Sequence, residues 1–326
     1  MLVVLTGASG HVGGNLTRAL LEQGRKIRVL VRPGDTRAVD GLPVEQVTGD
    51  LLDYQSVVSA FTGASVVYHL AARIAITRDE DEEVFRTNVE GTRNVVNAAL
   101  QCGVRRMVHF SSVHAYYQHP MDQPIDETRP LADVEGELAY DRSKARGEKE
   151  VMLGVQRGLD AVIVNPGAVM GPIDYKPSPM GQVVLDLCKR KLPALIQGGY
   201  DWVDVRDVVN GAMAAEQRGR TGEKYLLTGH WRSMKELAAL VEKASGVPAP
   251  RMITPMWLAQ VAAPLAETWS KVTKTRPKFT SSSLRILRGN SRFVCNKARR
   301  ELGYTTRPLE ETIQDAVDWF KANKLL

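Results

Sequence analysis

Three glycines near the start of the chain constrain its fold more than any other feature. A short apolar run from Val3 to Thr6 leads into Gly7, and Gly10 and Gly13 follow at intervals of three residues. Helical periodicity then begins at about residue 12, which places the glycines between a strand and a helix. Such glycines permit a tight turn and let a pyrophosphate rest on the helix N-terminus. The segment predicts a dinucleotide site formed by Gly7, Ser9, Gly10, His11, Val12 and Gly13.

The rest of the first half has the pattern of an α/β protein. Short apolar runs at 26–32, 44–48, 65–70, 106–111 and 161–165 alternate with helical periods at 12–23, 82–101 and 140–156. Strands that are apolar throughout are typical of a parallel sheet covered on both faces. We predict a Rossmann-type doubly wound parallel sheet over residues 1–171, with 200–229 returning to it. Residues 172–199 and 230–326 are expected to form mainly a smaller, mostly helical, discontinuous lobe that binds substrate.

Composition narrows the class of protein. The 326 residues are 44% apolar and 25% charged, as in ordinary globular proteins. No charged leader precedes the first strand, and no apolar stretch approaches the roughly 18 residues of a spanning helix. We therefore expect a cytoplasmic protein without a transmembrane segment. The three cysteines are widely spaced and the histidines form no HExxH pair, so we predict no metal site.

The end of the second strand bears on the choice of cofactor. Proteins that bind NAD usually carry Asp or Glu there, whereas a cation accommodates the 2′-phosphate of NADP. Here Arg32 ends the strand, Arg37 follows in the loop, and no acid precedes Asp35. A guanidinium matches a phosphate in geometry and charge. We predict that NADP(H) is preferred and NAD(H) possible; the alternative is that Arg32 caps the sheet or stacks on adenine.

Two further strand ends are candidate cofactor contacts. Asp50, followed by Leu51, ends the third strand and is placed to accept a hydrogen bond from the adenine amino group. The fourth strand ends in small residues that let the backbone approach the cofactor, and the predicted contacts there are Leu70, Ala71 and Ala72. His69 in the same run is expected to be a packed aromatic without a chemical role.

A tyrosine and a lysine mark the candidate catalytic centre. Tyr140 and Lys144 are four residues apart, hence on one face of the predicted helix. A tyrosine with the ordinary pKa of about 10 is a poor base near neutral pH. A nearby ammonium group, together with an oxidised nicotinamide, would favour the phenolate. Ser111 and Ser112 end the fifth strand, where a hydroxyl can bond the substrate oxygen, and His114 is expected to be a pocket wall.

Several motifs together resemble those of the extended short-chain dehydrogenase/reductases, the NAD-dependent epimerase/dehydratase superfamily. In order they are TGASGHVG, GDLLD, HLAA, NVEGT, FSS, YDRSK and NPGAVMGP, and the late FVCNKARRELGY extends the resemblance over nearly the whole chain. The VLVRP run is most similar to the branch of dihydroflavonol 4-reductases and 3β-hydroxysteroid dehydrogenases. The resemblance implies catalytic roles for Ser112, Tyr140 and Lys144, and nicotinamide contacts from Asn88, Pro166, Gly167, Ala168 and Val169.

The resemblance also suggests an activity. We expect an NAD(P)-dependent oxidoreductase that reduces a ketone with NADPH, or oxidises the alcohol, with Tyr140 as the acid/base. Val113 and His114 stand where dehydratases commonly have Asp-Glu, which argues against dehydration. The alternatives are a nucleotide-sugar epimerase that retains NAD and a cofactor-binding redox sensor, although a sensor does not need the catalytic set. A homodimer through helices 82–101 and 140–156 is a further family-level expectation.

The C-terminal third carries an uneven charge. The formal net charge is +6, and residues 271–300 hold ten Lys or Arg and no acid. Three interpretations remain open: a solvated basic face, a clamp for an anionic substrate, or peripheral contact with an anionic membrane on which 256–269 lies flat. The stretch belongs to no recognised nucleic-acid module, so nucleic acid is not an expected partner. The expected partner is a small carbonyl or alcohol substrate, which no motif identifies.

Overall fold

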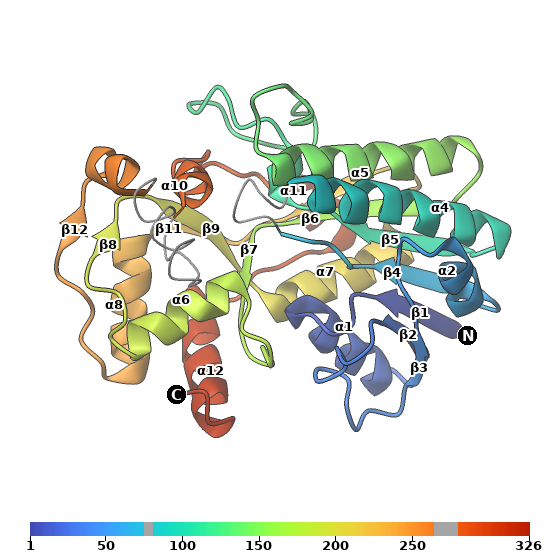
Figure 1. The fold of residues 1–326 in the computed structure, drawn as a ribbon, viewed down its shortest axis with the longest axis horizontal. Coiled ribbons are helices and arrows are strands. Elements are labelled where there is room, and N and C mark those ends of the chain that lie inside the picture. Colours follow the sequence, from blue (N-terminus) through green and yellow to red (C-terminus); the bar gives the residue numbers. More distant parts are fainter. Residues whose placement is uncertain (75–80, 264–279) are drawn as a thin grey trace.

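A seven-stranded parallel sheet forms the centre of the protein. The computed structural model describes residues 1–74, 81–263 and 280–326 (Figure 1). The strand order is β10-β6-β5-β4-β1-β2-β3, and every neighbouring pair is parallel. The strands are β1 (Leu2–Thr6), β2 (Lys26–Val31), β3 (Glu45–Thr48), β4 (Val66–His69), β5 (Arg106–Phe110), β6 (Ala161–Pro166) and β10 (Lys224–Leu227). This confirms the predicted Rossmann-type fold. The chain reverses its direction of progress between β1 and β4, and this switch point is where such sheets open a ligand crevice.

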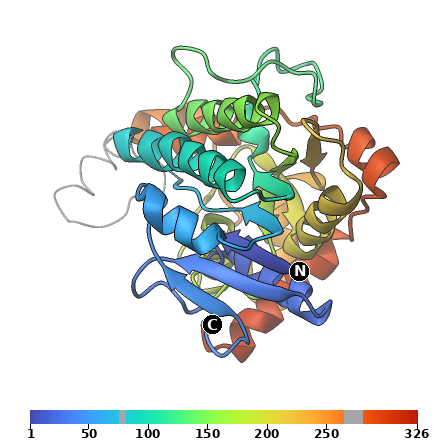
Figure 2. The ribbon, with the colours of Figure 1, turned by 90° about the vertical axis from the view of Figure 1, so that its right-hand side faces the viewer.

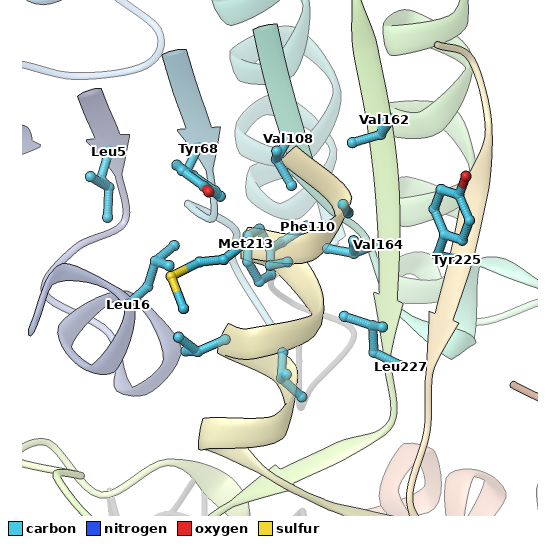
Figure 3. Packing of buried hydrophobic residues seen from close by; sticks show 14 of the residues in the cluster. Leu5, Leu16, Tyr68, Val108, Phe110, Val162, Val164, Met213, Tyr225 and Leu227 are labelled. Carbon is cyan, nitrogen blue, oxygen red and sulfur yellow. The ribbon is translucent and has the colours of Figure 1, made fainter. Parts of the chain in front are cut away.

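Helices cover both faces of this sheet (Figures 1 and 2). One face carries α1 (His11–Glu22) and α7 (Val205–Arg218), and the other carries α2 (Tyr54–Phe61), α4 (Gly91–Gln101) and α5 (Ala139–Gln156). Successive strand residues point to opposite faces, so Leu5 of β1 packs with α1 while Val4 packs with α2. Figure 3 shows Leu16 of α1 and Met213 of α7 against Leu5, Tyr68 and Val108 of the sheet.

The segment predicted as one long helix at 82–101 contains a local irregularity. It comprises α3 (Asp81–Phe85), a π-helical turn η2 (Arg86–Glu90) and then α4. Such turns concentrate at functional sites because the extra residue re-aims a side chain. Here the turn carries Asn88, which is 3% exposed. A short 3₁₀ turn η3 (Val113–Ala115) follows β5.

A second lobe has its own apolar core, around Trp202, Leu237 and Phe320. Its helices are α6 (Pro179–Cys188), α8 (Met234–Ser245), α10 (Ser281–Leu287) and α12 (Leu309–Ala322). It also contains short strands that the sequence pattern did not suggest: β7 (Ala168–Met170), β9 (Gly199–Asp204) and β11 (His230–Ser233) form one small sheet, and β8 (Leu195–Ile196) pairs with β12 (Ile253–Thr254).

The chain passes between the two lobes more than once. Within 200–229, α7 and β10 join the main sheet, but β9 pairs with β7 and β11 of the small sheet. Helix α11 (Asn296–Leu302), inside the predicted substrate lobe, packs Ala298 and Leu302 into the core of the main sheet instead. The boundaries proposed for the two lobes therefore stay a prediction. Helix α11 packs against the first lobe.

The apolar segment predicted at 256–269 is described only in part. Residues 256–263 are helical and expose Trp257 and Val261, whereas 264–269 and the basic positions 271–279 lie outside the described residues. Among the helices of the described ranges, none is long and apolar enough to cross a membrane.

Candidate active site

The glycine turn brings the ends of β1 and β4 into close contact. Gly7 adopts φ +77°, and a Cβ at this position would lie 2.6 Å from the backbone nitrogen of Ala71. A Cβ at Gly13 would lie 2.2 Å from the carbonyl oxygen of Gly7. Gly10 precedes α1 and offers no side chain to its first N–H groups. The open helix N-terminus and the small glycine surface fit the pyrophosphate of a dinucleotide.

The loop after β2 holds an acid beside the predicted phosphate ligand. Arg32 is exposed and donates to Oδ2 of Asp35 at 3.3 Å, and Ser9 donates to the same oxygen at 3.1 Å. Burial raises the pKa of Asp35, but the Arg32 hydrogen bond and the Lys176 charge together lower it by more. The net pKa of Asp35 is therefore below its ordinary value. No role for Asp35 was predicted from the sequence. Arg37 is exposed in the same loop.

His11 and Val12 stand in the first turn of α1, where Nε2 of His11 donates to the carbonyl of Pro172 at 3.0 Å. This bond ties the cofactor turn to the loop that follows β7. The first turn of α1 is thereby fixed against the second lobe.

The predicted contacts after β3 and β4 lie at the same carboxyl edge. Asp50 is exposed, and its Oδ1 accepts from the Leu52 N–H at 2.8 Å, so part of its acceptor capacity stabilises its own turn. Leu51 is buried against α4, whose Gly91 approaches it closely. Leu70 continues from β4 by donating its N–H to Thr6, and Ala71 and the exposed Ala72 follow it.

Asn88 acts as a clamp between two segments. Its Oδ1 accepts from the Arg73 N–H at 2.8 Å, and its Nδ2 donates to the Arg73 carbonyl and to Ser143 Oγ, each at 2.9 Å. These bonds hold the chain after β4 against α5. His69 is buried, and its two ring nitrogens lie within hydrogen-bond distance of the hydroxyls of Thr6 and Thr92.

Helix α5 positions Tyr140 in its first turn and Lys144 one turn later. Lys144 is 4% exposed, and its Nζ donates to the Phe110 carbonyl at 2.7 Å. Burial lowers the pKa of Lys144 to about 8, although the charge of Glu148 opposes this shift. The lysine is therefore fixed beneath the end of β5.

The Tyr140 phenol and the Ser112 hydroxyl meet at this edge. Burial raises the pKa of Tyr140 to about 12; the hydrogen bond from Ser112 lowers it and the Asp141 charge raises it. The Ser112 Oγ accepts from the His114 N–H at 3.2 Å. Ser112 and Tyr140 are thus in contact, and Lys144 lies one helical turn after Tyr140. Oγ of Ser111 has no hydrogen-bond partner among the described residues.

Behind these groups lies a buried ion pair that sequence reasoning missed. Glu148 is fully buried and contacts Lys224 Nζ at 2.6 Å. Asn165 donates to Glu148 at 2.6 Å and to the Ser112 carbonyl at 3.0 Å. The available signal was the position of Glu148, one helical turn after Lys144.

The end of β6 at Pro166 leads into Gly167, which lies close to Asp201 of β9. A Cβ at Gly167 would lie 2.7 Å from atoms of Asp201, so glycine permits the contact between β6 and β9. Asp201 is buried and accepts from the Gly229 N–H at 2.6 Å, and burial raises its pKa to about 7. Ala168 and Val169 continue into β7 and are partly exposed.

A cavity of about 650 Å³ opens beside this cluster. His114 and Asp141 line it from η3 and α5, Ala168 and Asp201 from the small sheet, and Leu284 from α10. The cavity therefore lies between the lobes, and Val113 and Asp141, the chain neighbours of Ser112 and Tyr140, are among the residues that line it.

Comparison with known proteins identifies the family. Residues 3–227 match the model described as "NAD dependent epimerase/dehydratase family". The chain is 37% identical to "Sterol demethylase protein B" of Methylococcus capsulatus over the full length of both, and 34% identical to a putative dihydroflavonol 4-reductase of Synechocystis, covering 97% of this chain and 94% of that one. Among solved structures, "gox2253" has 34% identity and a TM-score of 0.86, covering 99% of this chain and 98% of that chain.

The chain belongs to the NAD-dependent epimerase/dehydratase family and is an extended short-chain dehydrogenase/reductase. It is an NAD(P)-dependent oxidoreductase. The predicted family is confirmed, and its dihydroflavonol reductase and 3β-hydroxysteroid dehydrogenase branch is represented among the relatives. A nucleotide-sugar dehydratase structure with bound NAD, from Streptomyces venezuelae, has 22% identity and a TM-score of 0.78, covering 99% of this chain and 98% of that chain, and so shares the fold alone.

Proposed function

We propose that this enzyme reduces a ketone with NADPH and catalyses the reverse oxidation of the alcohol. The observation that carries the proposal is the hydrogen bond between Ser112 and Tyr140, with Lys144 one helical turn away, beside the cavity that His114 and Asp141 line. Bound NADPH would supply the hydride for this reaction. Tyr140 gives its proton to the carbonyl oxygen, and Ser112 orients that oxygen by a hydrogen bond. The Lys144 ammonium stabilises negative charge on the phenol oxygen.

The substrate class is proposed to be a bulky, largely apolar ketone. One relative, from Stigmatella aurantiaca, is named a ketoreductase of a farnesyl-dihydroquinoline oxide and is 30% identical over 97% of this chain. Other relatives are named for sterols or hydroxysteroids. A cavity of about 650 Å³ has room for a ligand of that size.

Replacement of Tyr140 by Phe tests the mechanism. We expect turnover to fall by at least ~10²-fold, because no other group gives its proton directly to the substrate oxygen. The affinity for NADPH, measured by calorimetry, should change by less than about twofold, since the ring and the helix remain. A Y140F enzyme with near-normal turnover would refute the role of Tyr140.

Calorimetry with NADPH and NADH tests the proposed cofactor preference. A guanidinium–phosphate contact contributes about 1.5–3 kcal/mol, so Arg32→Ala should weaken NADPH binding by at least about tenfold. NADH binding should be almost unchanged. Asp35→Asn is the matched control, because it removes the competing carboxylate next to Arg32 and should not weaken NADPH binding. Tight NADH binding without preference would contradict the proposal and favour an epimerase that retains NAD.

We also propose a homodimer through α4 and α5, as in the family. Leu153 of α5 is 51% exposed, an apolar side chain that an interface would cover. Light scattering of Leu153→Glu should give the monomer mass where the wild-type protein gives the dimer mass. An unchanged mass would place the interface elsewhere.

A further inference from the structure

His114 and Asp141 form a pair of titratable side chains beside Tyr140. His114 Nδ1 lies 3.4 Å from Asp141 Oδ1, and the ring centroids of His114 and Tyr140 are 6.0 Å apart. Asp141 directly follows Tyr140 in the first turn of α5, so one helical turn holds both partners of the histidine. Within the described ranges, neither Nδ1 nor Oδ1 makes a hydrogen bond of normal geometry. Both residues line the cavity.

The surroundings favour the charged form of His114. Asp141 lies in the first turn of α5 and faces the imidazole. Burial lowers the pKa of His114, but the facing Asp141 raises it by more, so the net pKa lies above the ordinary value. The other ionisable side chains lining the cavity are Glu137, which is paired with Arg285 of α10 at 2.7 Å, together with Arg288, His119, Tyr200 and Asp201.

We propose that His114 supplies the proton that restores Tyr140 after each ketone reduction, with Asp141 positioning it in the protonated form. This inference rests on the proposed function. When the carbonyl carbon gains the hydride, the C=O π pair moves to oxygen, which takes the phenol proton of Tyr140. The phenolate then takes a proton from the His114 imidazolium through one water molecule in the cavity. Neutral His114 recovers its proton from solvent, and every step reverses in alcohol oxidation.

The relative acidities of the two groups make this transfer favourable. The Tyr140 phenol has a pKa of about 12, so its phenolate is a much stronger base than an imidazole whose pKa starts near 6.5. The geometry also leaves the substrate oxygen free for Ser112. The backbone N–H of His114 donates to Ser112 Oγ. The hydroxyl proton of Ser112 can therefore point toward the substrate or Tyr140.

The first test uses the cofactor-free protein and does not depend on activity. An NMR titration should give a His114 pKa above the ordinary value, and Asp141→Asn should lower it by about one unit or more, because the facing charge is lost. An Asp141→Asn protein with an unchanged His114 pKa would overturn the coupling on which the proposal depends.

The second test is the pH profile of ketone reduction. The wild-type rate should fall as pH rises through the His114 pKa, because only the imidazolium can donate. His114→Gln should lose at least about tenfold in turnover at neutral pH, and its profile should be flat across that window. Added imidazole should restore turnover to His114→Ala. His230→Gln, the same substitution at a histidine bonded to the Arg307 carbonyl outside the cavity, should keep the wild-type profile.

The outcomes separate this inference from the proposed function. If Tyr140→Phe retains turnover, the proposed function fails and the proton supply has no purpose. If Tyr140→Phe is inactive while His114→Gln keeps the wild-type rate and profile, only the role of His114 is refuted. Circular dichroism of each variant establishes that it is folded. If His114→Gln does not fold, Asp141→Asn still tests the proposal. Because this substitution should lower the His114 pKa, the rate of ketone reduction should begin to fall at a lower pH than in the wild-type enzyme.

Discussion

The side chains of Asp35 and Asp201, both near the site, have pKa values shifted in opposite directions because their immediate partners differ. Asp35 faces the guanidinium of Arg32 and the Ser9 hydroxyl, and its pKa lies below the ordinary value. Asp201 is buried with a single backbone donor, the Gly229 N–H, and its pKa is raised to about 7. A carboxyl without a cation is kept neutral by burial, whereas one beside a guanidinium stays charged.

This difference predicts how Asp201 affects stability as pH changes. The folded-state pKa of about 7 exceeds the unfolded value near 4, so the folded state binds the proton more tightly. Its effect favours folding most below about pH 4 and is lost as pH rises to about 7, a change of about 4 kcal/mol by linkage. Asp201→Asn keeps an acceptor for Gly229 and should therefore be more stable than wild type at pH 8, as measured by urea unfolding. Equal stabilities at pH 8 would contradict the raised pKa.

At the scale of elements, segments with an apolar run or a helical period were predictable, and strands without such a pattern were not. The glycine turn, the strands of the main sheet and helices α1, α5 and α12 follow from local patterns of apolar residues. β7 has only three residues, β9 contains two aspartates, and β11 contains a histidine and an arginine, so no apolar run marks them. The same holds for Asn88, whose role depends on the π-helical turn and on a distant backbone.

The candidate site divides in the same way. Tyr140 and Lys144 could be proposed because one helix fixes their spacing. Ser111 and Ser112 both end a strand, and only the family resemblance favoured Ser112. The pairing of Glu148 with Lys224 was not, since the two charges lie on α5 and β10 and meet only in the folded sheet. His114 was expected only as a wall, because its partner Asp141 becomes its neighbour through the packing of η3 on α5.

The buried pair between α5 and β10 gives a prediction at this scale. Glu148→Ala would leave Lys224 without its carboxylate in a largely buried place, so the free energy of unfolding should fall by about 3–5 kcal/mol. Adding Lys224→Met removes the unpaired cation, so the double variant should be more stable than Glu148→Ala. Urea unfolding of all variants completes the double-mutant cycle. Additive losses would show that the two side chains are not coupled.

The whole molecule is held together where the second lobe meets α7. Asp204 ends β9 and caps α7, accepting from the Arg206 N–H at 2.7 Å. Arg206 also bonds the Asp204 side chain and reaches Asp315 of α12 at 2.6 Å. Arg307, just before α12, pairs with Asp207 of α7 at 2.9 Å. Since α7 packs on the main sheet and α12 on the second core, these ion pairs couple the two lobes.

Asp204→Ala should therefore loosen the coupling as well as lower stability. The loss of a buried ion pair and a helix cap together should cost about 4 kcal/mol, whereas Asp315→Ala, at a partly exposed pair, should cost less than about 1 kcal/mol. All five tryptophans occur at or after position 202, so fluorescence reports unfolding of the C-terminal part, and circular dichroism reports the whole chain. The two urea transitions should coincide for wild type and Asp315→Ala. For Asp204→Ala the fluorescence transition should occur at lower urea, because the second lobe loses its attachment to α7. Coincident transitions in Asp204→Ala would mean that the apolar contacts between the lobes couple them without this carboxylate.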